Sequence, residues 1–306
     1  MPELLIFTAP KPFTNPHIAT IQRNAIRSWL ALGPRVDVIL VGQEEGLAEA
    51  AAELGVRHLP NVARNSSGTP LVSSIFNLAR QNSACPLLAY VNADILLMPD
   101  FVEGALCAAQ QAKDFLLVGQ RWDLDVREPL EFSSGWPERL RQRAQQQGKL
   151  HRASGSDYFI FPRHCFADMP AFAIGRAGWD NWMIYAGRRN GWPVVDATTS
   201  IMIIHQNHDY SHLPGGQPHY KLPETFENIR LAGGKRVIFE LRDVDRRLVD
   251  GRLRPLPFAW SRFWREAEIF PLVKLHSYPL GQLSYALFHP KKAYGEFRQS
   301  LKKGSK

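Results

Sequence analysis

Cysteine is scarce in this chain, with three residues among 306, and Cys85, Cys107 and Cys165 form neither a CxxC pair nor a Cys/His ligand pattern. We expect them to be ordinary thiols in the core or at the surface. No apolar run approaches the roughly 20 residues that a membrane-spanning helix needs. The N-terminus lacks the basic segment followed by an apolar one that marks a secretory signal. The sequence therefore predicts a cytoplasmic protein.

Glycine-rich phosphate-binding motifs are also missing. Neither the P-loop nor the dinucleotide-binding glycine fingerprint occurs, which argues against a kinase, a GTPase or a nicotinamide dehydrogenase. If the chain binds a nucleotide diphosphate, other groups must neutralise its charge.

Positive charge is concentrated near the C-terminus. Residues 235–306 contain 16 Lys and Arg against 7 Asp and Glu, whereas residues 1–234 contain 21 against 22. The basic residues alternate with aromatic ones in FAWSRFWREAEIF (258–270) and YALFHPKKAYGEF (285–297). Such an extension either lies on an anionic membrane face or packs its rings on the rest of the protein. Because no nucleic-acid-binding motif accompanies the charge, we expect no nucleic-acid partner.

Apolar runs alternate with helical patterns along the first two thirds of the chain, which predicts an α/β fold with a mainly parallel, Rossmann-like sheet flanked by helices. Asn15 and Pro16 are a typical helix start, Asp100 is expected to cap another helix, and residues 121–155 are expected to be loop-rich around one helix. We expect a catalytic domain over 1–233, with a nucleotide half of about 1–120 and an acceptor half of about 121–233, and an extension over 234–306. Expected strands cover 4–7, 36–42, 86–94, 115–120, 158–161, 193–196 and 200–204, and expected helices cover 16–32, 46–54, 71–82, 101–112, 137–147, 179–189 and 223–232.

Polar clusters follow several of these strands, where ligands bind in sheets of this kind. Thr8 to Phe13 follow the first strand, Asn92 and Asp94 end the third, and a cluster beginning with His205 follows a later one. A carboxylate beside a carboxamide can hold a hard divalent ion that in turn takes up diphosphate oxygens. The alternative for Asn92 and Asp94 is a turn stabilised by their own side chains.

These motifs, in this order, resemble those of the GT-A fold glycosyltransferases, in particular the bacterial family 2-like group, over about residues 3–230. The resemblance implies transfer of a hexosyl group from a nucleotide-diphosphate-sugar to an acceptor hydroxyl, with Mn²⁺ or Mg²⁺ as cofactor. AYVNADILL stands where the family has its D-x-D-like metal motif, with Asn92 in place of the first Asp. The resemblance assigns donor binding to Thr8, Ala9, Lys11, Asn92 and Asp94. It gives His205 as the residue that completes the metal shell, and His208 is the second candidate for that role.

Asp180 in GWDNW matches the family's general base. Its flanking residues Trp179 and Trp182 should partly desolvate the carboxylate and raise its pKa, which favours proton abstraction and a single, inverting displacement. The alternative is a simple helix start. Asp157 is the rival acid, which either holds the acceptor or closes a turn. Trp179, whose ring could stack on a sugar, and Asn181 are candidate acceptor contacts.

Other assignments remain open at this stage. Lys11, Arg23 and Arg64 could meet phosphate or base, or be solvated surface charges. A sugar-1-phosphate nucleotidyltransferase and a non-catalytic binding module of the same fold are the alternative functions. The acceptor is expected to be a carbohydrate or a lipid-linked molecule.

Overall fold

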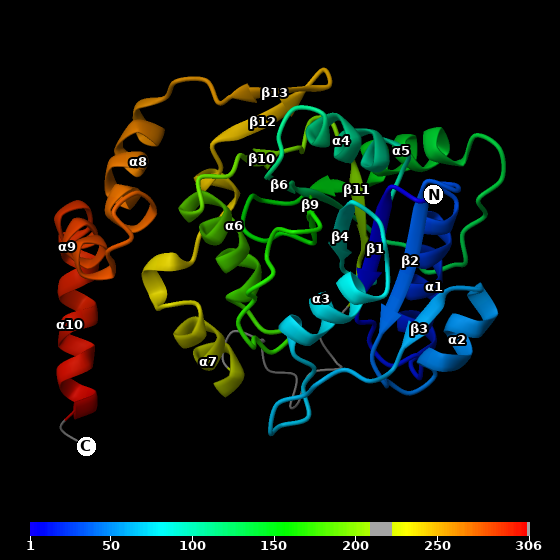
Figure 1. Cartoon of the computed structure of the whole chain (residues 1–306), viewed down its shortest axis with the longest axis horizontal. Coiled ribbons are helices and arrows are strands. Elements are labelled where there is room, and N and C mark those ends of the chain that lie inside the picture. The colour runs from blue at the N-terminus through cyan, green and yellow to red at the C-terminus, as the bar shows by residue number, and fades with distance from the viewer. Residues whose placement is uncertain (209–221, 305–306) are drawn as a thin grey trace.

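The computed structural model describes residues 1–208 and 222–304 (Figure 1). Within these residues, a nine-stranded sheet has the order β13-β12-β10-β6-β9-β4-β1-β2-β3, and a smaller sheet has the order β5-β11-β7-β8. The large sheet comprises β1 (Leu4–Thr8), β2 (Val36–Val41), β3 (Arg57–Leu59), β4 (Leu87–Val91), β6 (Leu116–Val118), β9 (Tyr158–Pro162), β10 (Val194–Asp196), β12 (Arg246–Val249) and β13 (Arg252–Pro255). The small sheet comprises β5 (Ile95–Leu96), β7 (Arg121–Leu124), β8 (Lys149–Leu150) and β11 (Ile203–Gln206).

The large sheet is mainly parallel, which confirms the predicted fold class. Strand β1 runs parallel to both β2 and β4, and β10 runs parallel to both β6 and β12. Two strands, β9 and β13, run against their neighbours. Every residue of β1 and β4 is buried, as their continuous apolar runs require of strands covered on both faces.

Helices cover both faces of the large sheet. Phe76 and Trp179 belong to the apolar cluster on one face, and Trp29 and Phe101 belong to the cluster on the other. The helix start at Asn15 is confirmed, since its side chain accepts hydrogen bonds from the amides of His17 and Ile18. The helices before residue 234 are α1 (Pro16–Leu30), α2 (Leu47–Leu54), α3 (Val72–Gln81), α4 (Asp100–Ala109), α5 (Trp136–Gln147), α6 (Trp179–Arg189) and α7 (Pro223–Leu231).

One local prediction was wrong and another was incomplete. The residue that caps α4 is Pro99, and the carboxylate of Asp100 instead accepts from Arg141 of α5 and from the amide of Met202. Pro99 already has a helical φ of −54°, so the helix begins one residue earlier than expected. The segment predicted to be loop-rich around one helix also contains β7 and β8, which form because β11 offers β7 a parallel neighbour.

The large sheet continues past the boundary expected near Gly233. Strand β12 pairs with β10, with Arg246 opposite Val195, and β13 returns beside β12. Two short 3₁₀ helices, η3 (Lys235–Val237) and η4 (Leu241–Asp243), lead into these strands. The helical part of the extension therefore begins later, with α8 (Trp260–Val273), α9 (Tyr278–Phe288) and α10 (Pro290–Gly304).

These last three helices lie to one side of the sheet, at the left of Figure 1. Ile269, Leu272 and Val273 of α8 reach the apolar core, but Trp260 and Trp264 are more than half exposed. The α8 residues that pack on the rest of the protein are thus aliphatic, whereas the rings of this helix are exposed. In the described part of the chain, no helix combines the length and the apolar character needed to cross a membrane.

Candidate metal and nucleotide site

The site begins at the edge of the large sheet where β1 and β4 end. These strands are parallel neighbours, so Thr8 and the segment after Val91 emerge side by side. Because β9 runs antiparallel to β4, its first residue pairs with Val91, and Asp157 just before it reaches the same edge. The amide of Asn92 donates to the carbonyl oxygen of Asp157 at 2.9 Å.

The small sheet brings further groups to this edge. Ile95 of β5 lies opposite His205 of β11, and His205 lies opposite Asp123 of β7. Asp94, which directly precedes β5, is therefore held beside His205. The Nε2 atom of His205 is 3.9 Å from Asp94 Oδ2, and the Nε2 atom of His208 is 3.0 Å from the same oxygen. One ligand atom from each of these three residues lies within 4.8 Å of the other two.

The Asp94, His205 and His208 side chains fit a divalent metal. Asp94 Oδ1 is buried and has no hydrogen-bond partner among the described residues, so one carboxylate oxygen is available to a cation. Burial by itself raises the pKa of Asp94, but the hydrogen bond from His208 and the nearby positive charges outweigh it and hold the pKa well below its ordinary value. Asp94 is therefore an ionised ligand beside two imidazoles, a donor set suited to a first-row transition metal.

Lys11 lies against this cluster. Its Nζ is 3.1 Å from His208 Nε2 and 3.8 Å from Asp94 Oδ2. The buried side chain of Gln22 fixes the Lys11 backbone, accepting from its amide at 2.7 Å and donating to its carbonyl oxygen at 2.9 Å. Burial lowers the pKa of Lys11, and the carboxylate of Asp94 opposes that effect. Thr8 is fully buried, and Ala9 beside it is half-buried.

Three residues of the site were missed at the sequence level: Arg121, Asp123 and His151. The Nε atom of Arg121 lies 2.8 Å from Asp123 Oδ1, and its Nη1 lies 2.8 Å from both oxygens of Asp157. His151 Nδ1 lies 2.7 Å from Asp123 Oδ2, and His205 Nδ1 lies 3.4 Å from Asp123 Oδ1. A carboxylate behind a ligating imidazole orients the ring. The two-residue spacing of Arg121 and Asp123, which places both on one face of a strand, was the available signal.

Asn92 and Asp157 form a supporting pair. The side-chain amide of Asn92 donates to Asp157 Oδ1 at 2.9 Å. The main-chain carbonyl oxygen of Asn92 accepts from the main-chain amide of Ile95. Asp157 is 6% exposed, and both of its carboxylate oxygens accept from Arg121. In this arrangement Asn92 forms the turn that presents Asp94 and also fixes Asp157.

Asp180 stands in the first turn of α6. Its Oδ1 accepts from the amide of Gly178 at 3.2 Å, so the helix-start interpretation applies. Burial raises the pKa of Asp180, and the charge of Asp157 raises it further. A carboxylate with these surroundings takes up a proton more readily than an exposed one.

Tyr90 of β4 is a buried phenol whose pKa responds to three carboxylates of this region. Burial raises the pKa of Tyr90, and the negative charges of Asp94, Asp157 and Asp180 all add to that shift. These carboxylates come from the turn between β4 and β5, from the residue before β9 and from the first turn of α6.

The remaining predicted residues have structural contacts of their own. Trp179 is 6% exposed, and its ring packs 5.1 Å from that of Tyr90, which leaves little ring surface for a sugar. Asn181 donates to the carbonyl oxygen of Phe239 at 2.7 Å. Arg23 pairs with Glu53 at 2.8 Å and Arg64 pairs with Glu44 at 2.9 Å, and within the described residues neither contacts Asp94. The cluster predicted to begin at His205 continues into 209–221, outside the described residues.

No protein-family model matches the sequence, and no curated protein matches it. Among solved structures, the chain is similar to residues 1–349 of Staphylococcus aureus TarS in complex with UDP-GlcNAc, with 12% identity over 75% of this chain and 65% of that one and a TM-score of 0.49. It is also similar to glucosyl-3-phosphoglycerate synthase from Mycobacterium tuberculosis with Mn²⁺, UDP and phosphoglyceric acid, with 13% identity over 76% of this chain and 78% of that one and a TM-score of 0.47.

A third similar structure is the mannosyltransferase PcManGT from Pyrobaculum calidifontis in complex with GDP-Man and Mn²⁺, with 12% identity over 69% of this chain, 58% of that one and a TM-score of 0.43. The chain thus spans less than two thirds of the TarS fragment and of this mannosyltransferase. At these identities and TM-scores, the similarities assign no activity to this chain, so the assignment depends on the chain's own site.

Proposed function

We propose that this chain is a metal-dependent glycosyltransferase that moves a sugar from a nucleotide-diphosphate-sugar to an acceptor hydroxyl. The observation that carries the proposal is the ionised, largely buried Asp94 carboxylate beside two imidazoles and an ammonium group. One of its oxygens accepts no hydrogen bond from the residues that the structure describes. It lies at the carboxyl edge of a mainly parallel sheet, where α/β proteins bind nucleotides.

On the donor side, Asp94, His205 and His208 would hold the metal. A bound divalent ion supplies positive charge that stabilises the diphosphate as a leaving group. Two imidazoles with one carboxylate favour Mn²⁺ over Mg²⁺, because Mg²⁺ prefers oxygen ligands. Lys11 adds a second positive charge at the end of β1, where Thr8 and Ala9 would contact the donor.

On the acceptor side, Asp180 would accept the proton of the attacking hydroxyl. Its raised pKa supports this role, whereas both oxygens of Asp157 are already engaged by Arg121. Direct activation of the acceptor by one base gives a single displacement with inversion at the anomeric carbon. NMR of the product would test this, since retained configuration excludes it.

The catalytic part would comprise residues 1–233 together with β12 and β13, which complete the sheet. The described donor-side groups all come from residues before 209. Asp157 and Asp180 belong to the half expected to bind the acceptor, about 121–233.

Calorimetric titration with UDP, GDP, CDP and TDP tests the donor site directly. We expect one diphosphate to bind with Mn²⁺ and to lose most of its affinity in excess chelator. Asp94→Asn removes the charge with little change of shape and should abolish the effect of Mn²⁺. Asp125→Asn, at an exposed aspartate, is the matched control and should bind like the wild type.

Unchanged affinity in Asp94→Asn, or equal affinity with and without chelator, would remove Asp94 from the proposed role. Metal-dependent diphosphate binding without hydrolysis or transfer of any donor sugar would identify a non-catalytic module of this fold.

A further inference from the structure

Exposed apolar side chains are concentrated on the C-terminal helices. Among the described residues, twelve of the sixteen exposed large hydrophobic side chains fall between residues 258 and 297. Large exposed apolar surfaces on a folded protein mark an interaction site. These twelve are Phe258, Trp260, Phe263, Trp264, Phe270, Leu275, Leu280, Leu283, Leu287, Phe288, Tyr294 and Phe297.

Five of these rings form one continuous surface. Phe258 contacts Trp260 with ring centroids 5.3 Å apart, Trp260 contacts Phe263 at 5.9 Å, and Phe263 contacts Trp264 at 5.2 Å. Trp264 then contacts Phe288 at the end of α9, at 6.2 Å. The surface therefore extends from the residues before α8 to the end of α9, and we call these five residues the ring surface.

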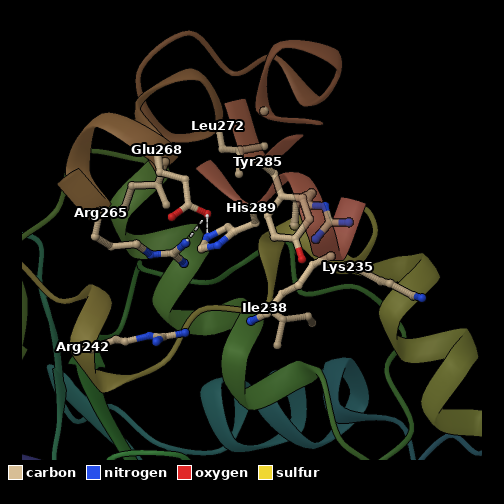
Figure 2. A pocket seen from close by; sticks show the side chains of 12 residues that line it. Lys235, Ile238, Arg242, Arg265, Glu268, Leu272, Tyr285 and His289 are labelled. Atoms are coloured by element: carbon tan, nitrogen blue, oxygen red, sulfur yellow. Dashed lines mark ion pairs between the residues drawn. The ribbon is translucent and has the colours of Figure 1, made fainter. Parts of the chain in front are cut away.

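A cationic cavity of about 240 Å³ lies between α8, α9 and η3 (Figure 2). Two of the residues that line it, Arg265 and His289, directly follow Trp264 and Phe288 of the ring surface in the chain. The cavity and the ring surface therefore lie next to each other, where the first half of α8 packs against the end of α9. Five Lys and Arg side chains line the cavity, with Glu268 as the one carboxylate among the lining residues. They are Lys235, Arg236, Arg242, Arg265 and Lys292.

Part of this positive charge has no partner. Glu268 pairs with Arg265 at 2.8 Å and with His289 at 3.2 Å, as Figure 2 shows. Arg236 pairs with a glutamate of α10, and its guanidinium lies 3.4 Å from the centroid of the Tyr285 ring. In contrast, no ion pair in the described part of the chain involves Lys235 or Lys292.

The charges around the ring surface also favour an anionic partner. Residues 258–299 contain six Lys and Arg and three Glu. A second copy would bring the same positive surplus to the contact and be repelled. A bilayer with anionic lipids offers both an apolar interior for the rings and phosphates for the cations.

We propose that α8, α9 and the start of α10 dock this protein on an anionic phospholipid surface, with the ring surface inserted and a headgroup phosphate in the cavity. Tryptophan and phenylalanine favour the boundary between headgroups and acyl chains. Lysine and arginine near that boundary are attracted to anionic headgroups. This docking does not depend on the proposed transferase activity, since no group of the Asp94 cluster takes part in it.

Vesicle sedimentation with the full-length protein tests the proposal. We expect binding to vesicles of phosphatidylcholine with phosphatidylglycerol, little binding to phosphatidylcholine alone, and weaker binding as salt is raised. The double variants Trp260→Ser/Trp264→Ser and Lys291→Glu/Lys292→Glu, and the cavity variant Lys235→Glu, should each lower the partition coefficient by about tenfold or more. Phe226→Ser changes an exposed ring on α7 and should bind like the wild type.

Far-UV circular dichroism and urea unfolding must show that each variant is folded. Equal binding to both kinds of vesicle, or none, would overturn the proposal. Wild-type binding by the two double variants would also overturn it. Wild-type binding by Lys235→Glu would show that the cavity takes no part in the docking. A dimer in light scattering that Trp260→Ser/Trp264→Ser dissociates would show instead that a second copy covers the ring surface.

Discussion

Two aromatic clusters in this protein have similar ring contacts but opposite surroundings. Phe76 of α3 is fully buried and packs 5.0 Å from Phe7 and 5.6 Å from Phe161. Trp264 of α8 packs at similar distances from Phe263 and Phe288, yet its residue is 54% exposed. Ring contacts alone therefore do not make a core. Phe76 lies between a sheet and its covering helices, whereas no described element covers the rings of α8.

The charged groups of the two regions differ in the same way. At the sheet edge, Asp94 and Asp157 are largely buried, so their charges act through low-dielectric surroundings and shift the pKa of their neighbours. Around the ring surface, Lys235, Lys291 and Lys292 are exposed to water and are suited to attract a charged partner. Burial thus favours chemistry in the first region, and exposure favours contact with another surface in the second.

Among the buried carboxylates of the first region, Asp180 should be the most sensitive to substitution. Asp180→Asn should lower the turnover number about 10²- to 10⁴-fold, because a positioned general base contributes that much. Diphosphate affinity should stay at the wild-type value, since Asp180 lies outside the donor-side cluster. Donor hydrolysis or transfer, followed by diphosphate release, measures the rate, and calorimetry measures the affinity. Near-normal turnover would exclude Asp180 as the base.

Removing a ring from the buried cluster should cost far more stability than removing one from the exposed cluster. Phe76→Ala should lower the free energy of unfolding by about 3–5 kcal/mol, because it leaves a cavity in the core. Trp264→Ala should change it by no more than about 0.5 kcal/mol, as at most surface positions. Urea unfolding of the two variants in parallel gives both values. A large loss of unfolding free energy in Trp264→Ala would show that this ring stabilises the fold as a core ring does.

A smaller effect is expected at Asp123, which lies behind His205 and His151. Asp123→Asn should weaken Mn²⁺ binding about 10- to 100-fold, because it removes the carboxylate charge 3.4 Å from His205, one of the imidazoles that we propose as metal ligands. Competition with a fluorescent metal chelator measures this affinity. Asp125→Asn again serves as the control. An unchanged Mn²⁺ affinity in Asp123→Asn would show that Asp123 does not orient His205.

A smaller effect still is expected on the acid side of the rate–pH profile, which should lie at a higher pH than an ordinary aspartate would give. A base must be deprotonated, so activity is lost as the pH falls through the pKa of Asp180. Since burial raises that pKa, the loss should begin at a higher pH than the ordinary value of 3.8 allows. Rates of donor turnover against pH, with a stability check at each value, measure the acid side of the profile. A rate that stays level into the ordinary aspartate range would contradict a desolvated base.

Much of the fold could be predicted because local patterns and tertiary contacts agree. The apolar runs of β1 and β4 predict buried strands, and both are buried throughout. The start of α1 at Asn15 and Pro16 depends only on neighbouring residues, and it was predicted correctly. In contrast, β12 pairs with β10, which lies about 50 residues earlier, and no local pattern in the sequence predicts that pairing.

The class of fold and the main polar groups at the ends of β1, β4 and β11 could be read from local patterns, because hydrophobic periodicity and strand ends are local properties. Which of these groups meet depends on contacts between segments far apart in the chain. The antiparallel direction of β9 brings Asp157 to Asn92, and the small sheet brings Asp123 to His205. Such contacts also make Phe76 a core ring and Trp264 a surface ring, since burial depends on whether another layer of the fold covers a ring.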